Sequence, residues 1–180
     1  MVVLGKRYAR VALMTLVGVL FVFQNIAASS LVWGALSPAD PEFQRQTHLP
    51  QINVPDAWNL TWGSSDVIVA VIDSGIDITN PDLVGNIWVN ADEISNNGID
   101  DDRNGYIDDV TGWDFVTKSN DPQPKFEPGW TEIGVNHGTI VAGILAARGG
   151  NDLGVAGVAW RVSLMPLRVL NGAGVGDTFG

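Results

Sequence analysis

The fold class that the sequence predicts is α/β, with a parallel sheet flanked by helices, and three stretches carry this prediction. Residues 67–72 form an unbroken apolar run, mostly β-branched, which is typical of a strand that is buried on both faces. Residues 137–148 contain small residues that would let a helix pack closely on a sheet, and residues 162–170 have the composition of a second strand. A strand, a helix and a strand in this order predict a right-handed crossover between parallel strands. Pro166 cannot donate a ladder hydrogen bond, so we expect it at a sheet edge or a bulge.

We expect residues 1–28 to be a cleaved signal peptide, and the protein therefore to be secreted. A segment with three basic residues precedes an apolar run over residues 11–23, and small residues follow at 27–29. The alternative is an uncleaved membrane anchor, because apolar residues resume at 31–33. The first apolar run is shorter than the roughly 20 residues that a spanning helix needs, which favours the signal peptide.

The positions of prolines and charged residues predict how the rest of the chain is organised. We expect an irregular lead-in at 29–50, where prolines interrupt any helix, and then one domain at 51–180 that carries an acidic insert at 92–111 and is incomplete at its C-terminus. Without residues 1–28 the chain holds 7 basic and 20 acidic residues, a net charge of −13. This charge argues against nucleic acid and anionic membrane surfaces as partners. The chain has no cysteine, which excludes disulfide bonds and thiolate metal sites.

Two residues in the predicted unit have the chemistry of a proton relay. Asp73 ends the first strand, where a carboxylate against an apolar core needs a partner, and His137 stands where the predicted helix begins. The positive end of a helix dipole favours the neutral imidazole that a general base needs. A carboxylate bonded to one ring nitrogen would fix the tautomer and stabilise the imidazolium. Taken singly, Asp73 could be a turn former or a phosphoryl-accepting aspartate, and His137 a helix cap.

The acidic insert predicts a calcium site. Laid on an EF-hand loop, the segment places oxygen ligands at alternate positions and a glycine at the sharp turn. The candidate ligands are Asp100, Asp102, Asn104, the carbonyl of Tyr106, and Asp108. Position 12 of such a loop is Thr111, which cannot supply the usual bidentate carboxylate. A solvated turn with surplus charge is the alternative, but so many close aspartates repel one another without a cation, and hard oxygen ligands suit calcium.

Four motifs resemble the subtilisin-like serine proteases, or subtilases, in the family's order and spacing. They are Val-Ala-Val-Ile-Asp-Ser-Gly-Ile-Asp at 69–77, Asn-Pro-Asp-Leu at 80–83, His-Gly-Thr-Ile-Val-Ala-Gly at 137–143 and Gly-Val-Ala-Gly-Val-Ala at 154–159. The resemblance covers residues 40–180 and implies the N-terminal part of a subtilisin-like catalytic domain. It also implies that acidic inserts of this kind bind calcium, and that the bound calcium has a structural role.

The resemblance implies a serine endopeptidase that acts on polypeptide substrates, with Asp73 and His137 as two members of an Asp, His, Ser relay. Gly174, Val175 and Gly176 match the segment that pairs with an extended substrate in the family. The family's Gly-Thr-Ser-Met-Ala-type nucleophile segment does not occur in these 180 residues, so we expect this chain alone to be inactive. We also expect a monomer that has no membrane contact after signal cleavage.

The competing interpretation is a non-catalytic extracellular module, either a calcium-binding domain or a pseudoprotease. It is motivated by the complete acidic segment beside a relay that lacks its nucleophile. Substrate specificity does not follow from this sequence in either case.

Overall fold

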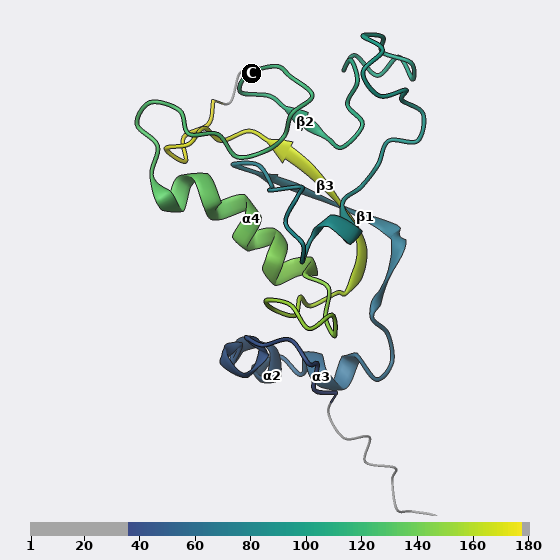
Figure 1. Cartoon of the computed structure of the whole chain (residues 1–180), viewed down its shortest axis with the longest axis vertical. Coiled ribbons are helices and arrows are strands. Elements are labelled where there is room, and N and C mark those ends of the chain that lie inside the picture. Colours follow the sequence, from purple (N-terminus) through teal and green to yellow (C-terminus); the bar gives the residue numbers. More distant parts are fainter. Residues whose placement is uncertain (1–35, 178–180) are drawn as a thin grey trace, which may run out of the picture. The chain divides into compact units, whose positions relative to one another are not determined.

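Parallel strands and one long helix form the framework that positions the site (Figure 1). The computed structural model describes residues 36–177. Strand β1 runs over Gly63–Asp73, β2 over Trp113–Asp114 and β3 over Arg161–Arg168, in the sheet order β1-β3-β2. Helix α4 spans Glu132–Ala146. The predicted α/β class with a parallel sheet is confirmed, whereas the predicted signal peptide at 1–28 lies outside the described residues.

The core of this framework lies between α4 and the sheet. Small residues of α4, Ala142 and Ala146, allow the helix to lie close to the sheet, and they pack with Val71 of β1 and Leu164 of β3. The chain therefore forms the expected strand, helix, strand unit, with β1 and β3 as parallel neighbours.

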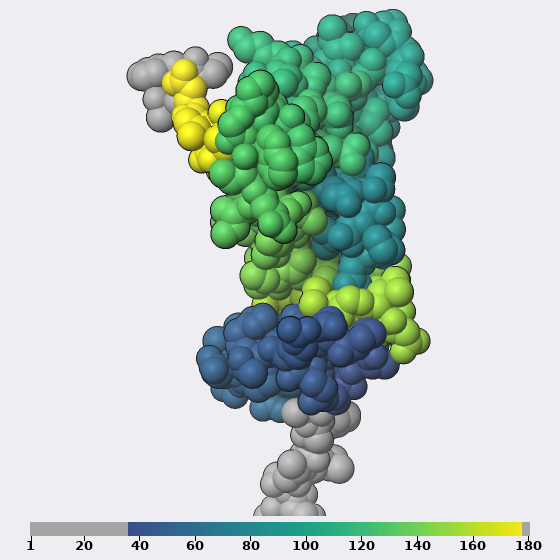
Figure 2. All heavy atoms as spheres, turned by 60° about the vertical axis from the view of Figure 1, so that its left-hand side comes forward, coloured from purple at the N-terminus to yellow at the C-terminus, as the bar shows by residue number. Residues whose placement is uncertain are grey.

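Short helical segments occur in the lead-in at 29–50, which the sequence predicted to be irregular, and just after it. They are η1 at Phe43–Arg45, α2 at His48–Gln51 and α3 at Val54–Ala57, and a further one, η2, lies at Val84–Asn86. Pro50 does not break α2, because it lies in the first turn, where a backbone N–H has no helical acceptor. Leu49 and Trp58 pack with Trp160, so the lead-in is attached to the segment that enters β3, as the contact of dark blue and yellow-green atoms in Figure 2 shows.

Pro166 lies in β3, the central strand of the three, and the expectation of an edge or a bulge was wrong. On one side β3 pairs with β1 in continuous register from Ser163 to Arg168, after an irregularity between Gly63 and Ile68 of β1. On the other side its Leu164 carbonyl accepts from Trp88, and β2 pairs with it over two residues only. Backbone groups of residues two apart point the same way along a strand, so Pro166 faces this sparsely paired side with Leu164. A missing N–H costs little there.

The prediction that β1 is buried on both faces was wrong, because only one of its faces is covered. Val71 is buried under α4, whereas Ile72, the next residue, is 64% exposed and Ile68 is exposed as well. Successive side chains of a strand point to opposite faces. Among residues 36–177, no helix covers the face that carries Ile68 and Ile72.

Helix α4 begins five residues before the predicted start. Thr131 is its N-cap, with a side-chain oxygen that accepts the Gly134 N–H at 2.9 Å. Glu132 adds a carboxylate to the first turn, where the helix dipole favours it. His137 consequently lies in the second turn, so the argument from the helix end does not apply to it.

Candidate active site

Asp73 is held at the end of β1 by the backbone around it. Its carbonyl oxygen accepts the Val169 N–H, and the Ser74 N–H donates to its Oδ1 at 2.6 Å. Gly75 follows at φ +101°, and a Cβ there would lie 2.5 Å from the Pro122 carbonyl oxygen. The turn therefore requires glycine both for its backbone conformation and for space. Together these contacts fix a nearly buried carboxylate at the carboxyl edge of the sheet.

His137 faces this carboxylate from α4. Its Nδ1 lies 2.8 Å from Oδ2 and 2.9 Å from Oδ1 of Asp73. An ionised carboxylate only accepts hydrogen bonds, so when Asp73 is ionised Nδ1 is the donor, and a neutral ring then has its lone pair on Nε2. The side chain of His137 is 56% exposed, and its Nε2 makes no hydrogen bond within residues 36–177. The arrangement can accept a proton at Nε2 while Asp73 stabilises the resulting cation.

The turn after β1 is fastened to α4 on both sides of His137. The Ser74 hydroxyl accepts the Gly138 N–H at 3.1 Å and donates to the Val135 carbonyl at 3.3 Å. Further along, the Asp77 N–H donates to the Thr139 hydroxyl at 3.0 Å. These side chains set the distance between the turn and the helix, and so the distance between the two members of the pair.

The predicted substrate segment, Gly174, Val175 and Gly176, lies in a loop beside a cavity of about 590 Å³. The structure folds this loop as a turn around Asn171 and gives it no strand. The Val175 N–H donates to Asn171 Oδ1 at 3.0 Å, and its carbonyl accepts the Asn171 N–H at 2.9 Å. Gly174 adopts φ +76°, which suits glycine, and its N–H donates to the Asn171 carbonyl.

A buried charge network lies at the same edge of the sheet. Arg168, fully buried at the end of β3, pairs with Asp114 at 2.8 Å and with Glu127 at 2.6 Å. Lys125 also pairs with Asp114, at 2.6 Å. Burial raises the pKa of Asp114, but hydrogen bonds, that from Lys125 first, outweigh burial and lower it. The pKa of Glu127 is lowered chiefly by its hydrogen bond from Arg168. Glu127 in turn accepts the Gly172 N–H at 2.9 Å, which ties the network to the predicted substrate loop.

The acidic insert brings together three carboxylates, and one of them was missed by sequence reasoning. Oxygen atoms of Glu93, Asp100 and Asp102 lie within 4.8 Å of one another, a possible metal-binding cluster. Glu93 also accepts the backbone N–H of Asp102 and of Asp108, so it stands inside the folded loop. The hydrogen bond from the Asn90 side chain is the main reason that the pKa of Asp102 is lowered, against the effect of burial.

The other three predicted ligands have contacts of their own. Both carboxylate oxygens of Asp108 accept backbone N–H groups, those of Asn97 and Gly98, at 3.0 Å. The Asn104 side chain donates to Asp102 at 3.0 Å. The Tyr106 ring packs against aromatic neighbours. Neither Asp108 nor Asn104 belongs to the three-carboxylate cluster.

Comparison with known proteins decides the family. Residues 64–179 match the sequence model of the subtilase family, Peptidase_S8. This chain belongs to the subtilase family. The subtilase is 48% identical over 91 residues to Subtilisin-like protease 1 of Plasmodium berghei, across 50% of this chain and 14% of that protein. It is 34% identical over 141 residues to thermitase of Thermoactinomyces vulgaris, across 78% of this chain and 39% of the relative.

A solved structure supports the same assignment. A protease from Pseudoalteromonas arctica PAMC 21717 matches the subtilase with a TM-score of 0.52 and 36% identity, over 79% of this chain and 41% of that one. The subtilase thus spans about two fifths, or less, of the length of these relatives. Another relative, 33% identical over 140 residues (78% of this chain and 21% of the relative), is named a halolysin-like extracellular serine protease, Nep, of Natrialba magadii. Within the described residues, no helix of the subtilase is both long and apolar enough to cross a membrane.

Proposed function

We propose that the protein is a secreted serine endopeptidase in which His137 is the general base and Asp73 orients it. The observation that carries this proposal is the contact of 2.8 Å between His137 Nδ1 and Asp73 Oδ2, in a histidine whose side chain is 56% exposed. In this role Nε2 accepts the hydroxyl proton of a serine while the Oγ of that serine forms a bond to the carbonyl carbon of the substrate. The same nitrogen then gives the proton to the leaving amine as the peptide bond breaks.

The nucleophile is the member of the relay that these 180 residues do not supply. No Gly-Thr-Ser-Met-Ala-type segment occurs among them, so the 180-residue chain alone should form no acyl-enzyme. Secretion rests on the composition of residues 1–28 and on the extracellular relative. Polypeptides as substrates follow from the family to which the chain belongs.

The chain offers a matched control for the histidine, because His48 is its only other one and is exposed. In the full-length protein with its serine, His137→Ala should lower kcat by about four orders of magnitude or more. His48→Ala should leave kcat and KM unchanged. A His137→Ala enzyme that kept more than a tenth of the activity would remove His137 from the reaction.

For the substrate segment we propose that an extended peptide lies along Gly174, Val175 and Gly176, beside the cavity that Val175 and Gly176 line. Both backbone groups of Val175 are bonded to Asn171, so a substrate strand must replace these bonds in order to pair with them. Asn171→Ala removes the side-chain acceptor without touching the relay. It should alter KM for peptides of several residues and leave a small ester substrate unaffected.

We also propose that the acidic insert binds one calcium ion through Asp100 and Asp102 with Glu93. Three carboxylates whose oxygens lie within 4.8 Å suit a hard cation and repel one another without it. Asn104, Asp108 and the Tyr106 carbonyl are the further oxygen ligands that the loop pattern suggests. If the protein proves catalytically inactive, calcium binding at this insert is the function that remains.

Calcium titration tests this proposal independently of peptidase activity. Saturable binding and a higher unfolding temperature are expected, and Asp100→Asn/Asp102→Asn should abolish both. Asp66→Asn, which neutralises one exposed carboxylate of β1, should abolish neither. Calcium binding of equal strength in the double variant would place the ion elsewhere.

A further inference from the structure

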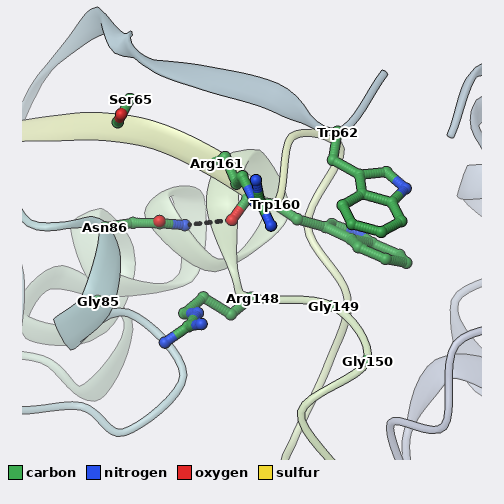
Figure 3. Close-up of a pocket in the computed structure, with 9 residues that line it drawn as sticks. All are labelled: Trp62, Ser65, Gly85, Asn86, Arg148, Gly149, Gly150, Trp160 and Arg161. Carbon is green, nitrogen blue, oxygen red and sulfur yellow. Dashed lines mark hydrogen bonds between the residues drawn. The ribbon is translucent and has the colours of Figure 1, made fainter. Parts of the chain in front are cut away.

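A second hollow lies at the opposite end of the sheet from Asp73. Trp62 directly precedes β1, and Arg161 opens β3, so both stand at the amino ends of parallel strands. With Arg148, Asn86 and Trp160 they line a cavity of about 440 Å³ (Figure 3). Its residues differ in kind from Asp73 and His137. The cavity lies at the amino end of β1 and Asp73 at the carboxyl end, so the length of the strand separates the two sites.

One wall of the cavity combines stacked aromatic rings with a guanidinium. The rings of Trp62 and Trp160 stack with centroids 5.4 Å apart, and Arg161 Cζ lies 5.4 Å from the Trp62 centroid. Stacking on an indole holds a guanidinium by its face and leaves its N–H edge free. Trp62 is 40% exposed, so apolar surface is available directly beside that edge.

The second arginine enters from the segment after α4. Arg148 lies over Gly85, where an added Cβ would come within 2.9 Å of its Cδ and 2.7 Å of its Nη1. Figure 3 shows Arg148 and Arg161 on two different segments that border the cavity, with Arg148 extending toward Gly85. Absence of a side chain at residue 85 is therefore what lets Arg148 reach the cavity.

Neither arginine is neutralised by a neighbour. Within residues 36–177 the ion pairs of lysine and arginine use Arg45, Lys125 and Arg168, and none involves Arg148 or Arg161. Two unpaired guanidinium groups at one cavity stand out in a chain of net charge −10. Planar guanidinium edges bind carboxylates through paired hydrogen bonds.

The floor between the arginines is fixed. Asn86 is 6% exposed, and its Nδ2 donates to the Ala146 carbonyl at 2.8 Å and to the Trp160 carbonyl at 3.0 Å. These bonds join η2, the end of α4 and the start of β3. The cavity is consequently pre-formed, which lowers the entropy lost when a ligand binds.

We propose that this cavity binds an acidic polypeptide segment, with Arg148 and Arg161 on its carboxylates and the Trp62 ring against an adjacent apolar side chain. The aromatic wall favours a peptide over a simple anion, because a peptide can pack an apolar side chain against the Trp62 ring and inorganic phosphate cannot. The site is independent of the relay and holds whether or not the protein is a peptidase.

The test is fluorescence anisotropy with a labelled, end-blocked peptide of alternating Glu and Leu, and the same peptide with Gln for Glu as its control. The full chain carries His137→Ala, so that a bound probe is not cleaved. Saturable binding of the Glu peptide is expected, at least tenfold tighter than that of the Gln peptide, and weakening as salt is added.

Variants assign the binding to the cavity. Arg148→Gln and Arg161→Gln should each weaken it about tenfold, as the loss of one charged hydrogen-bonding group predicts. Gly85→Ala should also weaken it by displacing Arg148, while Arg103→Gln, which removes an equal charge in the acidic insert, should not. Circular dichroism and thermal unfolding confirm that each variant is folded.

Three results would overturn the proposal. They are the absence of saturable binding, an equal loss with Arg103→Gln, and equal affinity for the Gln peptide. Inorganic phosphate that displaces the peptide at the peptide's own concentration would replace the assignment with a general anion site.

Discussion

The absence of a side chain at Gly138 lets α4 bring His137 to Asp73, and replacement of this glycine by alanine should push the helix away from the turn. A Cβ at residue 138 would lie 2.3 Å from the Gly75 carbonyl oxygen and 3.1 Å from Asp73 Cβ. Ordinary contact begins at 3.4 Å, so helix and turn must separate by about 1.1 Å, the difference between 3.4 and 2.3 Å. Overpacking of this kind costs about 1–3 kcal/mol, against a helix-propensity gain of about 1 kcal/mol for alanine over glycine. Gly138→Ala should therefore lower the free energy of unfolding by up to about 2 kcal/mol.

The same helix contains the matched control. A Cβ at Gly143 meets no atom within 4 Å, so Gly143→Ala should raise the free energy of unfolding by about 0.5–1 kcal/mol through propensity alone. Urea unfolding of the full chain measures both, with the m-value as the check that two-state behaviour persists. A separation of that size also takes the contact of 2.8 Å between His137 and Asp73 beyond hydrogen-bonding distance. Equal stabilisation by both substitutions would show that α4 is not held against the turn as described.

Three further predictions concern the charge network and the helix start. Arg168→Met should lower the free energy of unfolding by about 3 kcal/mol, the lower end of the range for breaking a buried ion pair, because Asp114 still pairs with Lys125. Urea unfolding measures this loss, and a loss below about 1 kcal/mol would contradict burial of the pair. The folded-state pKa values of Asp114 and Glu127 are below the ordinary 3.8 and 4.5, so their stabilisation is complete above about pH 4.5 and is lost as pH falls through the lowered values. Unfolding temperatures between pH 7 and pH 2 should show this loss, and Arg168→Met should show less of it. Thr131→Ala removes the N-cap oxygen and should cost about 1 kcal/mol, while unchanged stability would argue for the later helix start that the sequence suggested.

The sequence was sufficient where the information is local. The apolar run at 67–72 and the segment at 162–170 predicted two parallel neighbours, and the motifs at Asp73 and His137 predicted two residues that the structure brings into contact. A strand end and a short helical motif carry their own composition, so no distant residue is needed to find them.

Features that depend on distant residues were missed or misplaced. The start of α4 was misplaced because the Thr131 cap and the bond from the Thr131 N–H to the Gly172 carbonyl cannot be seen in a window of sequence. Glu93 was missed because the EF-hand pattern reads forward from Asp100, whereas the fold returns an earlier residue to the loop. A search of the whole acidic insert for carboxylates, without a fixed loop template, could have included it.

The carboxyl edge of the sheet shows why the two charge systems have to be separate. Asp73 and Arg168 are register partners on adjacent strands, so an unneutralised Arg168 would compete with His137 for the Asp73 carboxylate. Asp114 and Glu127 take up the guanidinium instead, at 2.8 and 2.6 Å. Asp73 is thereby left to the Ser74 N–H and to the imidazole. Asp114 and Glu127 do not touch the pair of Asp73 and His137. Because they bind Arg168, they nevertheless determine which cation the Asp73 carboxylate can bind.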